Sequence, residues 1–316
     1  MKGKTFRSYC IIFLMMPALF ACSINKTAMR MVSNVLSSSS AGTAFASDDD
    51  PELVGDALPF ALKLYEILID EIRDNPNIYL AAGSGYIMYA NAYVQSPADM
   101  LPDAAFDKKE IMTLRAQKLY LRGRDYVLQG LEVKYPGFTG SLDNAAMTEF
   151  LGRIRKEDVA YLYWAAAGWL AAYATNPFDV SLGVGMKKAT AMMEAALRID
   201  EAYGDGVVHE LLVQYYGSLP QSMGGSEKRA RYHFNKAVEL SKGEKASPYV
   251  ALAATVSVKN QNIQEFTELL NKALAIDSTR KTGNRLANII SQRKARWLLE
   301  HRRDRFLLDP NEGEKK

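Results

Sequence analysis

The sequence predicts an all-α protein in which helical hairpins repeat along one domain, and three observations support this prediction. Across residues 51–308, apolar residues recur at spacings of three and four, as they do from Leu58 to Ile67 and from Ala189 to Leu197. Ala, Leu, Met, Glu, Lys and Arg dominate these stretches, whereas Gly and Pro cluster between them. No convincing β-rich alternating stretch interrupts the pattern.

Both helices of the tetratricopeptide unit, a hairpin of about 34 residues, have patterns that recur along the chain. The first-helix pattern, a large residue followed by small ones three and four later, fits residues 79–86 and 164–171. The second-helix pattern, small–x3–large–x2–small, fits 123–130, 189–196 and 230–237, and it fits 266–273 with Phe266 replacing the first small residue. Residues 51–308 are therefore predicted to form an irregular tetratricopeptide-like solenoid of about four helix-turn-helix repeats, with extra flanking helices. Insertions at 175–178 and 219–225 account for the irregularity.

The N-terminus predicts export. Three cations precede an apolar run over residues 9–20 that is too short for a permanent membrane span, which is typical of a signal peptide over residues 1–21. A small residue then stands directly before Cys22, as in the bacterial lipobox, although Phe20 is bulkier than the residue usual there. We expect acylation of Cys22 to anchor the protein to a membrane. The alternative is an ordinary secretory signal with an incidental cysteine.

Charge content bears on whether nucleic acid is a partner, and cysteine content bears on disulfides and metal binding. Of 39 Lys and Arg residues, three lie in the predicted signal peptide, so the mature chain carries 36 basic and 36 acidic residues. This balance gives no indication of a nucleic-acid partner. Cys10 leaves with the signal peptide, so the mature chain keeps one thiol and forms no internal disulfide or thiolate metal cage.

Two segments outside the predicted domain lack a helical apolar pattern. Residues 22–50 are expected to be a flexible tether, because the chain from residue 33 onward is poor in large apolar side chains and includes four consecutive serines. Asp50 followed by Pro51 is a signal for the start of a helix. Residues 309–316 are expected to be a disordered tail.

Side chains suited to catalysis or metal binding are few and scattered. The three histidines, His209, His233 and His301, include no i, i+4 pair, and no cysteine or carboxylate cluster surrounds them. The Gly183–Lys188 stretch lacks the ending and the preceding strand of a phosphate loop. We therefore expect no metal, no cofactor and no enzymatic activity; a periplasmic hydrolase would require a nucleophile and base that do not converge here.

Geometry of the tetratricopeptide unit predicts an apolar groove on the concave surface. Counting from Trp164 at the start of the pattern, Leu162, Ala165, Trp169 and Ala172 should face this groove. His209 should stand in a helix lining it and could supply a polar contact to a ligand carboxylate. An exposed Trp169 among small neighbours would suit an apolar ligand or a partner's helix. The alternatives are that Trp169 belongs to the core and that His209 is a core histidine bonded to a backbone carbonyl.

The last predicted helix is amphipathic and basic. Its cations lie near its C-terminal end, where the helix dipole favours them, and apolar residues alternate with them at helical spacing. One interpretation is a capping helix with a solvated face. The other is a subunit or partner contact through Trp297, Arg302, Phe306 and Leu307, because the chain end is unusually apolar.

Several segments together resemble the T component of TRAP transporters, a tetratricopeptide lipoprotein associated with a periplasmic solute-binding protein. They are 119–123, 163–169, 206–209, 224–230, 266–270 and 295–299. The resemblance extends from about residue 78 to 308. It implies a cryptic four-repeat fold and a role in solute uptake beside the solute-binding protein, the P component, and it allows a homotrimer with a ligand conduit.

These inferences combine into one functional expectation. The protein should be a periplasm-facing scaffold, lipid-anchored to the inner or the outer bacterial membrane, that docks a TRAP-type solute-binding protein. It should also hold or conduct the apolar or amphipathic ligand of that protein. The alternative is a general tetratricopeptide scaffold lipoprotein of outer-membrane assembly.

Overall fold

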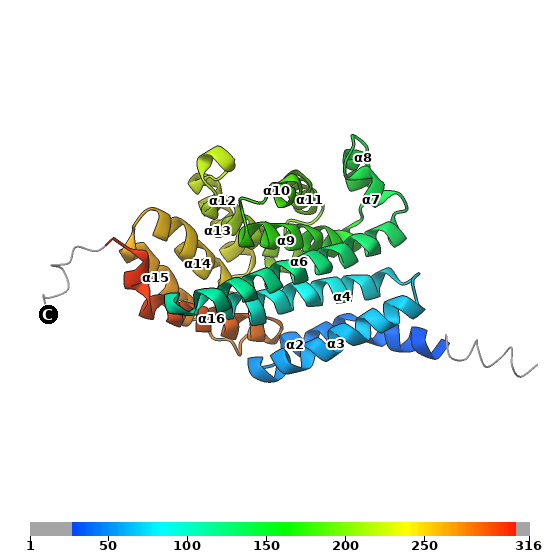
Figure 1. The fold of residues 1–316 in the computed structure, drawn as a ribbon, viewed down its shortest axis with the longest axis horizontal. Helices are drawn as coiled ribbons and strands as arrows, with labels where there is room; N and C mark the ends of the chain where they lie inside the picture. Colours follow the sequence, from blue (N-terminus) through cyan, green and yellow to red (C-terminus); the bar gives the residue numbers. More distant parts are fainter. Residues whose placement is uncertain (1–26, 308–316) are drawn as a thin grey trace, which may run out of the picture.

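The structure is a computed structural model that describes residues 27–307. Every regular element in that range is helical, which confirms the predicted all-α class. The predicted signal peptide, Cys22 and the predicted tail lie outside the described residues. Figure 1 shows the helices stacked side by side along the length of the molecule.

Long helices alternate with short turns. The N-terminal half contains α2 (Ser39–Ala46), α3 (Pro51–Glu71), α4 (Pro76–Tyr89), α5 (Ser96–Asp99), α6 (Phe106–Lys134), α7 (Phe138–Ser141) and α8 (Met147–Arg153). The C-terminal half contains α9 (Val159–Thr175), α10 (Val180–Val184), α11 (Met186–Ile199), α12 (Val207–Ser218), α13 (Glu227–Leu240), α14 (Ser247–Leu252), α15 (Ile263–Leu274) and α16 (Arg285–Glu300). Two π-helical turns, Ala90–Gln95 and Ala253–Ser257, continue α4 and α14.

Consecutive long helices pack as hairpins. The pairs are α4 with α6, α9 with α11, α12 with α13, and α14 with α15. All four stretches with the second-helix pattern lie on the second helix of a pair. Each hairpin also packs on the next, through α6 with α9, α11 with α12, and α13 with α14.

Glycines let helices cross closely, both within a hairpin and between neighbouring hairpins. A Cβ atom on Gly83 of α4 would stand 2.5 Å from the carbonyl oxygen of Gly123 on α6. A Cβ on Gly168 of α9 would stand 2.8 Å from the Cβ of Arg124 and 3.1 Å from the carbonyl oxygen of Tyr120. Real Cβ atoms do not approach so closely, so these positions require glycine at this helix separation.

The predicted helix start at Asp50 and Pro51 is confirmed. Asp50 is the N-cap of α3, and its Oδ1 accepts a hydrogen bond of 3.0 Å from the backbone N–H of Leu53. Asn75 caps α4 in the same way, again directly before a proline. These caps set where the first two long helices begin.

The predicted flexible tether is wrong over the part that the structure describes. Residues 27–36 and Ser39–Ala46 are helical. Met29 and Leu36 pack against the cluster of apolar side chains between α3 and α4, and Ser33 is fully buried, accepting a 2.9 Å hydrogen bond from Asn75 Nδ2. A few well-placed apolar side chains therefore outweigh the polar composition of this segment.

The C-terminal helix returns to the N-terminal helices. Figure 1 shows α16 beside α2. Arg285 Nη1 donates to the carbonyl oxygen of Ser47 at 3.3 Å, and Arg293 Nη1 lies 2.8 Å from Glu52 Oε1 on α3. Part of the basic surface of α16 therefore pairs with the beginning of the same domain.

Candidate functional site

The residues predicted to line the groove are buried. Leu162, Ala165 and Ala172 have no exposed surface, Trp169 is 6% exposed and His209 is 1% exposed. The first four residues belong to α9, which packs against α4, α6, α11 and α12, whereas His209 belongs to α12, which packs against α13. The prediction of an accessible groove at these residues is wrong, and Trp169 belongs to the core.

Trp169 is enclosed by specific contacts on two sides. The guanidinium carbon of Arg124 lies 5.2 Å from the centroid of the indole ring, a cation–π contact. Gly185 lies so close to the indole that a Cβ there would be 2.5 Å from its Cδ1. The indole thus fills the space between α6, α9 and the start of α11 rather than a binding surface.

His209 forms a buried pair with His233. The two Nδ1 atoms, on α12 and α13, are 2.7 Å apart, so one ring donates a hydrogen bond and the other accepts it. Burial lowers the pKa of both imidazoles, that of His233 to about 4. His209 Nδ1 therefore pairs with another imidazole rather than with a backbone carbonyl, and its Nε2 lies 3.5 Å from Glu201 Oε1. Nothing in the sequence pattern singled out His233 as its partner.

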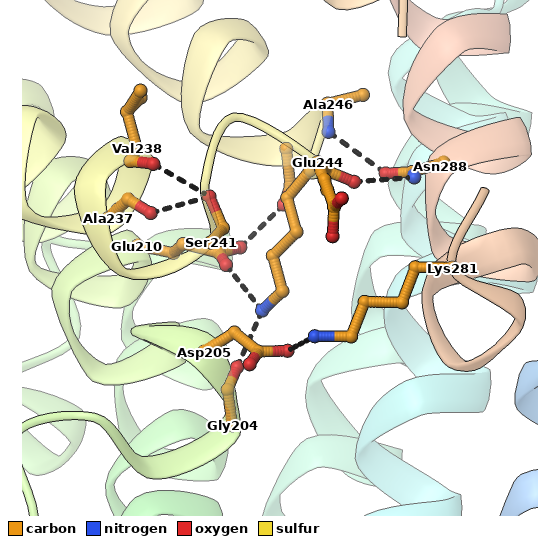
Figure 2. Close-up of polar contacts among 12 residues, drawn as sticks. Gly204, Asp205, Glu210, Ala237, Val238, Ser241, Glu244, Ala246, Lys281 and Asn288 are labelled. Carbon is orange, nitrogen blue, oxygen red and sulfur yellow. Dashed lines mark hydrogen bonds and ion pairs between the residues drawn. The ribbon is translucent and has the colours of Figure 1, made fainter. Parts of the chain in front are cut away.

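A second buried polar cluster joins α12 to the loop before α14 (Figure 2). Lys245, only 8% exposed, donates hydrogen bonds of 2.7 Å from its Nζ to Glu210 Oε1 and to the carbonyl oxygen of Gly204. The Ser247 hydroxyl donates to the other carboxylate oxygen of Glu210. Asn288 of α16 exchanges two 2.9 Å hydrogen bonds with the backbone of residues 244 and 246.

This cluster is structural. Both oxygens of the Glu210 carboxylate have donors, and Lys245 has two acceptors, so neither group needs a ligand to complete it. Lys281 Nζ lies 2.6 Å from Asp205 Oδ2 at the edge of the same cluster. These contacts connect the α12–α13 hairpin to α16 and to the loop that precedes it.

An open cavity of about 410 Å³ lies on the outward face of α6. Its lining residues are Lys118, Leu121, Arg122, Asp125, Tyr126 and Gln129, which follow one another at helical spacing. Ile111 and Leu114 continue the same face toward the start of the helix and are 69% and 50% exposed. We call this surface, from Ile111 to Gln129, the α6 face. Unlike the predicted groove, it is accessible.

A glutamate with several donors borders the α6 face. Glu66 of α3 accepts hydrogen bonds from the hydroxyls of Tyr86, at 2.6 Å, and Tyr126, at 3.1 Å, and its Oε2 lies 2.6 Å from Lys63 Nζ. Burial on its own would raise the pKa of Glu66, but these donors hold it below the ordinary value. Arg122 lies over the Tyr86 ring, 5.4 Å from its centroid. The α6 face therefore has a rigid, charged border.

The predicted contact residues near the C-terminus divide into buried and exposed ones. Phe306 packs edge-on against Phe266 and is buried, and the partly buried Trp297 stacks on His301 with ring centroids 4.4 Å apart. Arg302 and Leu307 are exposed. Phe306 therefore serves the fold, and only part of the predicted contact surface is available to a partner.

Two negative findings apply to the described range. Between residues 27 and 307, no cluster of three or more His, Cys, Asp or Glu side chains is placed to hold a metal ion. In the same range, no helix combines the length and apolarity needed to cross a bilayer.

Comparison with known proteins identifies the family. The family model of the TRAP transporter T-component matches residues 47–306, which is nearly all of the described chain. An uncharacterized protein of Treponema pallidum (strain Nichols) is 34% identical over 322 residues, covering 97% of this chain and 100% of the relative. The family is a transporter component and not a known enzyme family, and membership gives the protein a role in TRAP transport. The chain belongs to the TRAP transporter T-component family.

Proposed function

We propose that this protein is an exported, lipid-anchored scaffold that docks the periplasmic solute-binding protein of a TRAP transport system. The family match over residues 47–306 is the observation that carries this proposal. We also propose that the four helix pairs are irregular tetratricopeptide units, because the two helix patterns and the close glycine crossings coincide with them.

The α6 face is the docking surface in this proposal. It combines exposed apolar side chains, Ile111 and Leu114, with a cavity bordered by charged groups of both signs. Interfaces of this kind bury apolar anchors at their centre and keep charged residues at the rim. Because the predicted groove residues are buried, we propose that any contact with the transported solute also occurs on this face.

A binding titration with matched variants tests the docking surface. The double variant Ile111→Asp/Leu114→Asp should bind a TRAP-type solute-binding protein of the same organism at least ten-fold more weakly than the parent. Phe178→Asp is the control, because Phe178 is 92% exposed and lies outside α6, before α10. Equal affinities of parent and double variant would refute the α6 face, and a parent that fails to bind would refute docking.

Anchoring is tested separately. Cys22→Ser should move the protein from the detergent phase to the aqueous phase in Triton X-114 partitioning, because the acyl chains would be lost. Unchanged partitioning would contradict lipidation at Cys22 without affecting the test of the docking surface.

A further inference from the structure

The α6 face carries a row of cations. Arg115, Lys118 and Arg122 follow one another at spacings of three and four residues, so they lie along one side of the helix. We call these three residues the cation row. All three are exposed, and the row runs beside the apolar side chains of Ile111 and Leu114. Lys118 and Arg122 also line the cavity of the α6 face.

Carboxylates of the described residues leave the row largely unpaired. Neither Arg115 nor Lys118 has a carboxylate oxygen from residues 27–307 within 4.0 Å of its cationic nitrogens. Arg122 Nη1 lies 3.5 Å from Glu66, which already accepts from a lysine and two tyrosines. Asp125, three residues after Arg122, is bonded to the arginine next to it in the chain, at 2.6 Å. The positive charge of the row is therefore available to another molecule.

Repulsion within the row opposes the formation of α6. Lys118 has Arg115 three residues before it and Arg122 four residues after it, and like charges at these spacings destabilise a helix. Cations on other helices have acidic neighbours at such spacings, as Arg231 has in Glu227. Residues 111–129 of α6 instead contain four cations and one acidic residue. The fold therefore maintains an excess of positive charge on this face that its own packing does not require.

Two tyrosines of α4 hold the arginines of the row in place. The guanidinium carbon of Arg115 lies 5.8 Å from the centroid of the Tyr89 ring, and that of Arg122 lies 5.4 Å from the centroid of the Tyr86 ring. A guanidinium on an aromatic face keeps N–H donors at its edge for a carboxylate. Because the rings fix these positions before a partner arrives, binding costs less side-chain entropy.

The row is suited to an acidic protein surface. Its first and last residues are separated by about 10 Å along the helix axis, which exceeds the reach of one small carboxylate solute. Helices that lie on membranes place their cations on one face and their large apolar side chains on the opposite face. Here Ile111 and Leu114 share the face with the cations, as they do in an interface with a protein.

We propose that the cation row binds carboxylates of the solute-binding protein, so that this partner presents an acidic patch to the α6 face. The inference rests on the docking function proposed above and adds the chemistry of the partner's surface. Ile111 and Leu114 supply the apolar contact, and the row orients the partner. Opposite charges also speed the encounter of two proteins, so association depends on salt concentration.

Binding kinetics with matched variants test the row. The full, detergent-solubilised protein is titrated with a TRAP-type solute-binding protein of the same organism. At about 50 mM salt, Lys118→Glu should bind about five-fold more weakly than the parent or worse, and the difference should shrink at about 500 mM, because salt screens the charges. Lys187→Glu on α11 is the control, since Lys187 is exposed and has no carboxylate of the described residues within 4.0 Å.

Thermal melting separates this effect from damage to the fold. In Lys118→Glu the repulsion from Arg115 and Arg122 becomes attraction, so the melting temperature should stay the same or rise. Weaker binding by a variant that is at least as stable as the parent cannot result from unfolding.

Carbodiimide coupling tests the contact itself. The reagent joins a lysine amine to a touching carboxylate as an amide, with loss of water. Mass spectrometry of the coupled complex should find Lys118 joined to an Asp or Glu of the solute-binding protein. Lys118→Arg should bind like the parent and lack this product, because a guanidinium is not coupled. A complex of the parent that gives no such link would overturn the inference.

The remaining outcomes distinguish this inference from the docking proposal. If the parent and Lys118→Glu bind equally at every salt concentration, the acidic patch is refuted and docking stands. If the parent does not bind at all, docking is refuted and the inference with it. Phosphatidylglycerol vesicles give the last comparison, in a Cys22→Ser background without acyl chains. Vesicle binding that Lys118→Glu abolishes would assign the row to a membrane and overturn the inference.

Discussion

Helices α9 and α3 are both rich in apolar residues, yet their surroundings are opposite. Helix α9 is enclosed by four other helices, and eleven of its residues are buried, from Val159 to Tyr173. Helix α3 lies at the edge of the stack, buries one face and exposes Leu53, Phe60 and Ile67 on the other. Apolar content alone therefore does not distinguish a core helix from an edge helix. The arrangement of apolar residues around the helix does, because only a helix that is apolar on every side needs to be enclosed.

Removing the indole of Trp169 from α9 should cause the largest loss of stability. Trp169→Ala removes a side chain enclosed by Arg124 and Gly185, and it should lower the free energy of unfolding by about 3–5 kcal/mol. Urea unfolding followed by circular dichroism measures this loss. A variant as stable as the parent would mean that Trp169 is not part of the core.

A larger side chain at the helix crossing should have the next largest effect. Gly168→Leu would force α9 away from Arg124 and Tyr120, and we expect a loss of about 1–3 kcal/mol or more. Gly140 has no neighbouring atom within 4 Å of an added Cβ, so Gly140→Leu is the control. Similar melting temperatures for both variants would contradict the close crossing of α6 and α9.

The histidine pair should make stability depend on pH. In the folded protein the pKa of His233 is lowered to about 4, against about 6.5 in the unfolded chain. Its contribution is therefore present above pH 6.5 and is lost as the pH falls toward 4. Between pH 7 and pH 5 we expect a loss on the order of 1–2 kcal/mol.

Chemical denaturation at pH 7 and pH 5 measures this dependence. His233→Phe should reduce it, because the substituted side chain does not titrate. If the parent and His233→Phe lose the same stability over this interval, carboxylates rather than the histidine pair cause the pH dependence.

The smallest expected effect is on α3. Phe60→Ala removes a ring that is 76% exposed, so the unfolding free energy of the monomer should change by no more than about 0.5 kcal/mol. A loss comparable to that of Trp169→Ala would show that α3 has no free apolar face.

Local sequence patterns predicted much of the fold but little of the candidate site. The helix cap at Asp50 and the glycines at 83, 123 and 168 follow from short-range rules, and the structure places them as expected. The burial of Trp169 also had a local signal, since its helix is apolar on every side. The groove prediction missed it by relying on the ideal repeat, in which fewer helices surround this position.

Other features depend on contacts between distant parts of the chain. His209 and His233 are 24 residues apart, and Arg285 meets Ser47 across 238 residues. Spacing within one sequence carries no information on which of several helices will pack together at such distances. The accessibility of the α6 face is also not encoded locally. It depends on which other helices pack against α6 and which side of α6 they leave uncovered.

The return of α16 to α2 and α3 has an evolutionary consequence. A solenoid with free ends can gain or lose a hairpin, because each unit contacts only its neighbours. Here an additional hairpin would carry α16 away from Glu52 and Ser47 and would separate Lys294 from Asp99. Duplication or deletion of a unit would therefore damage both ends of the domain at once. We expect related chains to differ in their loops and insertions while keeping the number of hairpins constant.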